Sequence, residues 1–187
     1  MHGLGALLAN TGAKPPGSGS QDRAFMDQKV NMTPVHRPAA LEDAAALFDL
    51  RRRSILELAG KGLPAGEAEA WAGKLTLAGM EGKLRELEIW VAELDGVAAV
   101  WGAIRGDVLE GLYTAPEYAR RGVGSSMLGW LEGLMVARGV AAVHAEASSN
   151  AREFYLRRGY RMTGPQTAGR AWPIVKDLRE TPAEGKS

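Results

Sequence analysis

Residues 112–128 place a glycine-rich turn and two arginines directly before an apolar, helix-forming segment. Gly122 and Gly124 let the backbone approach a ligand closely, and the first N–H groups of a helix have no partners within it. Those donors, with the positive end of the helix dipole, suit a phosphate or diphosphate. Arg120 and Arg121 add two cations with forked hydrogen-bond donors. The spacing therefore predicts an anion-binding turn.

Two other interpretations of this turn compete with the anion site. Gly122-Val123-Gly124 followed by Glu146 could belong to a dinucleotide-binding fingerprint. However, Met127 stands where that fingerprint needs its third glycine, and seven residues separate the strand from the glycines where the fingerprint has a tight turn. The turn could also be a surface turn whose glycines only start a helix. Two adjacent arginines weaken that interpretation, because cations beside unpaired N–H groups need an anion.

The hydropathy pattern around the turn alternates between strand and helix periods. Asp95-Gly96 predicts a two-residue hairpin between two of the strands, and Gly139 and Gly159 predict helix ends. Gly111 is a poor strand former and indicates either a bulge that opens the sheet or a packing accommodation. Strands are expected at 34–38, 88–94, 97–104, 108–114, 140–147, 160–163 and 171–175, and helices from Leu41 to the break at 62–64 and at 67–77, 124–138 and 151–158.

This order predicts an α/β (α+β) domain whose mixed sheet is mostly antiparallel, with one central parallel pair around the long helix and helices on its flanks. The length of 187 residues suits one domain, expected at 32–187. Residues 1–31 contain the Gly/Ser/Pro stretch 14–20 and are expected to form a flexible N-terminal tail.

Composition narrows the function classes. Lys plus Arg number 23 against 22 Asp plus Glu, which argues against a dedicated nucleic-acid binder. The absence of cysteine excludes disulfides, thiolate metal sites and cysteine nucleophiles, and three scattered histidines give no metal site. No apolar run is long enough for a membrane helix and no secretory signal is evident, so a cytoplasmic protein is expected. Formation of a homodimer stays open.

Two segments resemble the GNAT superfamily of acetyl-CoA-dependent N-acetyltransferases. One is Ala119-Arg120-Arg121-Gly122-Val123-Gly124, and the other is Asn150-Ala151-Arg152-Glu153-Phe154-Tyr155-Leu156-Arg157-Arg158-Gly159-Tyr160. Both stand in the family's order and spacing, and the resemblance extends from Thr33 to about Lys176. The chain departs from the family at Ala119, where Arg or Gln is usual; Arg120 or Arg121 is expected to substitute for that side chain.

The resemblance implies the GNAT fold and acetyl-CoA as cosubstrate, without a metal. It implies that the backbone of Leu112, Tyr113 and Thr114 holds the pantetheine arm like an added strand. Asn150 is expected to cap the short helix and to contact the same arm. The resemblance assigns the diphosphate to the turn and helix start, namely Arg120, Arg121, Gly122, Val123, Gly124 and Ser125.

Acetyl transfer to an amine needs a base for the amine and an acid for the leaving thiolate. The resemblance makes Tyr155 the candidate acid, with core packing as the alternative role. Glu110 is the preferred base and Glu146 its competitor, either one tuned by burial, and both could instead be surface carboxylates. Trp71 is expected in the core rather than on an acceptor pocket. The arginines of the second segment are expected on a solvated face or near the phosphates: Arg152, Arg157 and Arg158.

These expectations combine into an N-acetyltransferase that acts on a primary amine, with a small molecule favoured over a protein lysine or N-terminus. Because the chain has no cysteine, the amine attacks directly in a ternary complex rather than through an acetyl-cysteine. A non-catalytic acyl-CoA-binding sensor is the alternative from another class.

Overall fold

The structure is a computed structural model that describes residues 33–167 and 171–179. The expected tail at 1–31 lies outside these residues. Within the described residues, seven strands form one sheet in the order β1-β2-β3-β4-β5-β7-β6. Every neighbouring pair is antiparallel except β4 and β5, which confirms the expected mixed sheet. The strands are β1 (Val35–Pro38), β2 (Glu88–Leu94), β3 (Val97–Arg105), β4 (Val108–Thr114), β5 (Ala142–Ser148), β6 (Arg161–Met162) and β7 (Ala171–Asp177).

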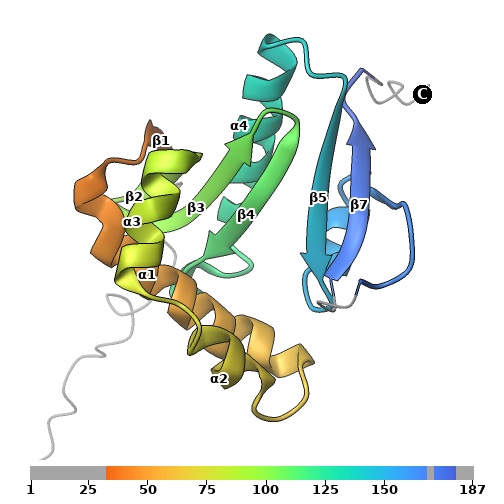
Figure 1. The fold of residues 1–187 in the computed structure, drawn as a ribbon. Coiled ribbons are helices and arrows are strands. Elements are labelled where there is room, and N and C mark those ends of the chain that lie inside the picture. Colours follow the sequence, from red (N-terminus) through yellow and green to blue (C-terminus); the bar gives the residue numbers. More distant parts are fainter. Residues whose placement is uncertain (1–32, 168–170, 180–187) are drawn as a thin grey trace, which may run out of the picture. The chain divides into compact units, whose positions relative to one another are not determined.

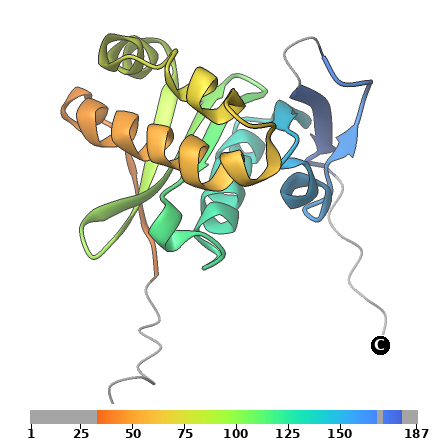
Figure 2. The ribbon, with the colours of Figure 1, turned by 90° about the horizontal axis from the view of Figure 1, so that it is seen from below.

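Helices cover both faces of the sheet (Figures 1 and 2). The α-helices are α1 (Ala44–Arg53), α2 (Glu67–Ala72), α3 (Leu77–Glu86), α4 (Val123–Ala137) and α5 (Arg152–Leu156). Short 3-10 helices are η1 (Leu41–Asp43), η3 (Gly60–Gly62) and η4 (Pro116–Tyr118), and η2 (Ser54–Ala59) is a π-helix. No helix in the described part of the chain combines the length and apolar character that a membrane span requires.

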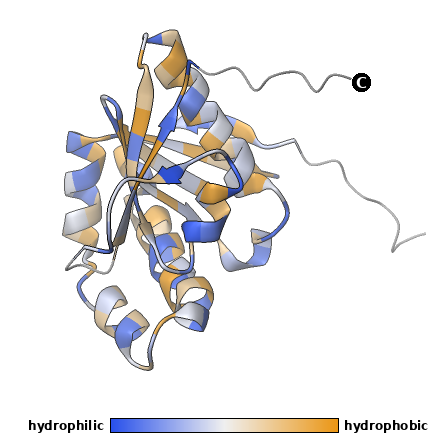
Figure 3. Cartoon of the chain, turned by 90° about the vertical axis from the view of Figure 1, so that its right-hand side faces the viewer, coloured by the Kyte–Doolittle hydropathy of each residue, from blue (hydrophilic) through white to orange (hydrophobic). Residues whose placement is uncertain are grey.

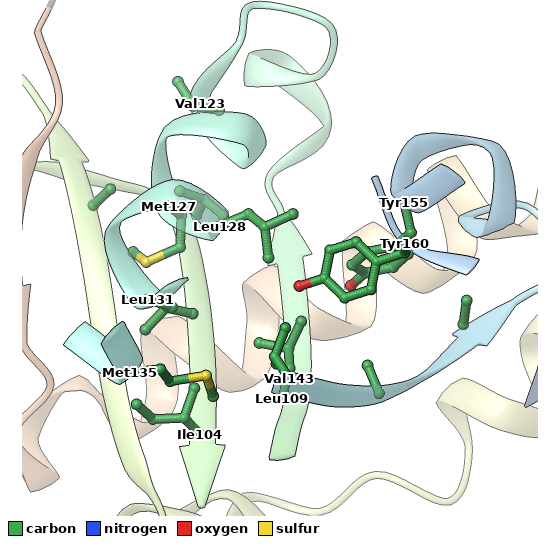
Figure 4. Close-up of a cluster of buried hydrophobic side chains, with 14 of the residues drawn as sticks. Ile104, Leu109, Val123, Met127, Leu128, Leu131, Met135, Val143, Tyr155 and Tyr160 are labelled. Atoms are coloured by element: carbon green, nitrogen blue, oxygen red, sulfur yellow. The ribbon is translucent and has the colours of Figure 1, made fainter. Parts of the chain in front are cut away.

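Of the three hydrophobic clusters in the described residues, two join the helices to the two faces of the sheet. α1 and α3 pack on one face through residues such as Leu47 and Met80, which meet Trp101 of β3. On the other face α4 buries Met127 and Leu131 within a cluster that extends to Tyr155 and Tyr160 (Figure 4). Hydrophobic residues concentrate on the central strands and on the inner sides of the helices (Figure 3). Strand β3 is therefore apolar on both faces, because each face is covered by helix.

The Asp95-Gly96 hairpin is confirmed. Both residues have positive φ, at 51° and 75°, which matches the type of two-residue turn whose twist fits antiparallel strands. The helix ends at Gly139 and Gly159 are confirmed as well, with φ of 77° and 85°.

The predicted helix at 67–77 is wrong in its extent. α2 ends at Ala72, and the hydroxyl of Thr76 accepts a hydrogen bond from the Gly79 N–H at 3.0 Å to cap a new helix, α3. The periodicity alone merged the end of α2 with this cap and missed α3. The first helix also differs from its prediction, because its second half is the π-helix η2, and such wider turns recur at functional sites.

The sheet opens between its two parallel strands. β4 and β5 pair only at Val108–His144 and Leu109–Ala145, after which they diverge (Figure 1). A register shift in the β3–β4 ladder coincides with the opening, since Ala103 pairs with Gly111 but Ile104 pairs with Leu109. Glu110 is thus the extra residue of a β-bulge, as Gly111 suggested. The packing accommodation holds too, because a Cβ on Gly111 would lie 2.9 Å from the Tyr113 ring.

Candidate active site

A cavity of about 1030 Å³ lies between the end of β4, the start of α4 and helix α5. Gly122 precedes α4 with φ of +86°, a conformation that glycine adopts without strain. The first helical hydrogen bond within α4 runs from the Ser126 N–H to the Gly122 carbonyl, so the N–H groups of Val123, Gly124 and Ser125 have no helical acceptor. A Cβ on Gly124 would lie 3.1 Å from the Thr114 hydroxyl and 3.8 Å from the Phe154 ring. The predicted anion-binding turn therefore borders the cavity. We call the first N–H groups of α4, together with this turn, the helix mouth.

The residues predicted to hold the pantetheine arm and the diphosphate do not all face the cavity. Leu112, Thr114 and Ser125 are half-buried and line the cavity. Val123 turns its side chain into the core and offers only its backbone. The arginines also divide: Arg120 lines the cavity with φ of 63°, whereas the Arg121 guanidinium lies 5.8 Å from the centre of the Tyr118 ring and is not among the lining residues.

A second cavity of about 660 Å³ lies on the other side of the opening. The two cavities carry opposite charge. Four cations and one carboxylate line the first: Lys61, Arg120, Arg157, Arg158 and Glu153. Three carboxylates and one lysine line the second: Glu67, Glu110, Glu146 and Lys74. The first therefore suits an anion and the second a cation.

The two cavities meet at the point where β4 and β5 diverge. Tyr155, predicted as the acid, is only 7 % exposed, yet it lines both cavities. Its ring packs edge-on against Phe154 and Tyr160, so its core role and its place in the site coexist. The residues shared by both cavities are Trp71, Leu112, Tyr113, Ser148, Ala151 and Tyr155. Trp71 was expected in the core, but it is half-buried and forms part of the cavity wall.

Burial raises the pKa of Tyr155 well above the ordinary value of a phenol. Burial also raises the pKa of Tyr160, and the neighbouring Glu132 carboxylate, which accepts a hydrogen bond from the Tyr160 hydroxyl at 3.0 Å, adds to the effect. Both phenols therefore stay protonated in the folded protein across neutral and mildly alkaline pH. A protonated phenol at the cavity junction is a proton donor.

These raised pKa values predict a loss of stability in alkali. Unfolded tyrosines release their protons near pH ~10, before the folded ones do, so the stabilisation is complete below that pH and is lost above it. Between about pH 9 and about pH 11 we expect each buried phenol to lower the free energy of unfolding by about 1.4 kcal/mol in total. Urea unfolding from about pH 9 to about pH 11 measures this loss, which Tyr160→Phe should reduce by the contribution of one phenol. Equal losses in the two proteins would contradict the prediction.

The two candidate bases are both exposed, which corrects the expectation that burial tunes them. Glu110 projects from the bulge and pairs with Arg105 at 3.0 Å, whereas Glu146 lies on β5. Both carboxylates line the second cavity, since both follow the last paired residues of β4 and β5, where the two strands diverge.

Asn150 does not cap α5, contrary to the prediction. The N-cap position is Ala151, and the side-chain Oδ1 of Asn150 instead accepts a hydrogen bond from the Ser148 hydroxyl at 2.8 Å. Asn150 still lines the first cavity. It lies close to Gly62, where an added Cβ would be 3.2 Å from the Asn150 Cβ. Sequence reasoning missed the contribution of η2, whose Ser54 and Ile55 also line this cavity.

Comparisons with known proteins agree with this geometry. The acetyltransferase (GNAT) domain family matches residues 60–176. A GCN5-related N-acetyltransferase from Rhodopseudomonas palustris is 30% identical, with a TM-score of 0.72 over 78% of this chain and 97% of that chain. The PaiA N-acetyltransferase of Thermoplasma acidophilum, solved with coenzyme A, is 19% identical, with a TM-score of 0.66 over 78% and 99%. YncA from Salmonella typhimurium, solved with acetyl-CoA, is 20% identical, with a TM-score of 0.55 over 83% and 99%. A comparison with curated proteins finds no match.

The opened mixed sheet, the helix mouth and the family match together define the class of this protein as an acyltransferase. The chain belongs to the GNAT acetyltransferase family.

Proposed function

We propose that this protein transfers an acetyl group from acetyl-CoA to a primary amine, with a small molecule as the favoured acceptor. The observation that carries the proposal is the meeting of a basic and an acidic cavity at one buried tyrosine. The basic cavity suits the phosphates of the cosubstrate, and the acidic cavity attracts a protonated amine. Tyr155 then stands between the two reactants.

The residues of the first cavity fit coenzyme A. The helix mouth offers N–H donors for a diphosphate, and a side chain at position 124 would fill the space between Thr114 and Phe154. Beyond Leu109, the edge of β4 that faces β5 has no strand partner among residues 33–167 and 171–179, so its N–H and C=O groups are available to an extended pantetheine arm. An N–H on this edge would also polarise the thioester carbonyl.

Acetyl-CoA supplies an activated acyl group as a thioester. Glu110 takes a proton from the acceptor amine, directly or through water, and so frees the lone pair that forms the new C–N bond. As the C–S bond breaks, the Tyr155 hydroxyl gives its proton to the leaving sulfur, and the second proton that the attacking nitrogen loses on forming the amide returns to the phenolate. The phenol is a weaker acid than a thiol, so its position at the junction must compensate for the unfavourable transfer. With no cysteine in the chain, the attack is direct.

A screen of amines for release of free CoA thiol tests the proposal. We expect thiol release that depends on an amine, and stronger competition from cationic acceptors than from acidic ones, since the second cavity carries three carboxylates. CoA binding without turnover for any amine would favour the alternative, a non-catalytic acyl-CoA sensor. An acceptor restricted to protein N-termini or lysines would overturn the small-molecule assignment.

Glu110→Gln tests the base. We expect kcat/KM to fall by about 30-fold near pH ~7 and by much less near pH ~9, where about a hundred times more of the amine is already neutral. Glu146→Gln is the competing variant and should lose less at both pH values. A larger loss in Glu146→Gln, or a loss in Glu110→Gln that does not depend on pH, would contradict the assignment of Glu110.

A further inference from the structure

The departure from the family motif at Ala119 removes a side-chain donor from the cofactor turn. The sequence suggested Arg120 or Arg121 as substitutes, but Arg121 stacks on Tyr118 and Arg120 is exposed on the cavity rim. We infer that Arg158, two residues after the end of α5, is the cation that binds the diphosphate at the mouth of α4. This inference rests on the proposed function.

Arg158 is held at the helix mouth by three contacts. Its Nη1 donates to the Phe154 carbonyl at 2.7 Å, and its guanidinium lies 3.7 Å from the centre of the Phe154 ring. Its Nη2 donates to the hydroxyl of Ser125, the third residue of α4. The Phe154 ring is also the one that a Cβ on Gly124 would approach. The guanidinium therefore lies beside the start of α4, where the N–H groups have no helical acceptor.

The charge of Arg158 calls for an anion at this place. No carboxylate of residues 33–167 or 171–179 forms an ion pair with it, although the side chain is partly buried. A guanidinium beside the positive end of a helix dipole is unfavourable by itself. An anion that binds both the helical N–H groups and the guanidinium removes this conflict, and the forked donors of arginine match two phosphate oxygens. The Ser125 hydroxyl holds the fork in place until such an anion binds.

Calorimetry with three probes separates the groups that Arg158 could read. Coenzyme A carries the diphosphate and a 3′-phosphate, dephospho-CoA keeps only the diphosphate, and pantetheine has neither. We expect Arg158→Gln to weaken binding of coenzyme A and dephospho-CoA by a similar factor, about 10- to 50-fold, and to leave pantetheine unchanged. Arg158→Lys keeps the charge without the fork and should give a smaller loss with the same selectivity. Arg161→Gln, an exposed neighbour outside the cavity, is the control for net charge.

Each outcome decides the inference. A loss for coenzyme A that vanishes with dephospho-CoA would assign Arg158 to the 3′-phosphate and overturn it. An equal loss for all three probes would mean that Arg158 only supports the fold, and thermal unfolding of Arg158→Gln and Arg158→Lys checks this independently. If the wild-type protein binds none of the probes, the proposed function fails and the inference with it. Selective loss in both variants, with Arg161→Gln unchanged, would support the inference.

Discussion

Replacing Tyr155 with phenylalanine is expected to lower kcat by about 10³-fold, the range that general acid catalysis supplies. The phenol lies where the two cavities meet and keeps its proton because burial raises its pKa. Without it the thiolate must leave unprotonated or take its proton from water. Single-turnover measurement of thiol release with a saturating amine reads this step directly.

The same variant should keep its cofactor affinity and its stability, and this separates catalysis from packing. The ring of Tyr155 contacts Phe154 and Tyr160, and phenylalanine preserves those contacts. In the described part of the chain no partner hydrogen-bonds to the Tyr155 hydroxyl, so its removal should change the free energy of unfolding by less than about 1 kcal/mol. Loss of stability in parallel with activity would assign Tyr155 to the core alone.

Replacing Gly124 with leucine is expected to weaken coenzyme A binding by at least about 100-fold, because the new side chain occupies the cofactor path. Its Cβ would start 3.1 Å from the Thr114 hydroxyl and point toward Phe154, both of which line the first cavity. The added atoms would stand in front of the free N–H groups at the mouth of α4. Calorimetric titration with coenzyme A measures the loss.

Gly129→Leu is the matched control for this prediction. Gly129 lies on the same helix, is exposed, and would have no atom within 4 Å of an added Cβ. Both substitutions remove a helical glycine, so both gain helix propensity of up to about 1 kcal/mol. We expect Gly129→Leu to bind coenzyme A like the wild-type protein. Equal binding by Gly124→Leu would show that the cofactor does not pass this glycine.

The variants at Gly124 and Tyr155 test two different parts of the proposed site. Gly124 borders the region that would hold the phosphates, and Tyr155 lies at the end where the acyl group would be transferred. If Gly124→Leu abolishes binding of coenzyme A while Tyr155→Phe keeps it, the phosphate-binding turn and the general acid are independent parts of the site. Their separation follows from the fold, since one residue lies on α4 and the other on α5.

Local signals in the chain determined much of the fold. The Asp95-Gly96 turn and the glycines at 139 and 159 all adopt the positive φ that their positions require. β2 and β3 are strongly apolar and mostly buried, and they pack against helices. Weaker signals are misread. The periodicity assigns the Thr76 cap that starts α3 to the preceding helix, so α3 is not predicted. The π-helix η2 also gives no distinct periodicity of its own.

The helix mouth could be predicted without the structure, because Gly122 and Gly124 act through backbone geometry that depends only on neighbouring residues. Which side chains serve that mouth depended on contacts between elements far apart in the chain. Arg158 reaches Ser125 across 33 positions, whereas the adjacent Arg121 turns away to Tyr118. The meeting of the two cavities at Tyr155 likewise arises only in the folded chain, because it requires β4 and β5 to diverge after two pairs. Residue spacing along the chain determines where the backbone N–H donors lie, whereas the position of a guanidinium at the end of a long side chain is determined only by tertiary packing.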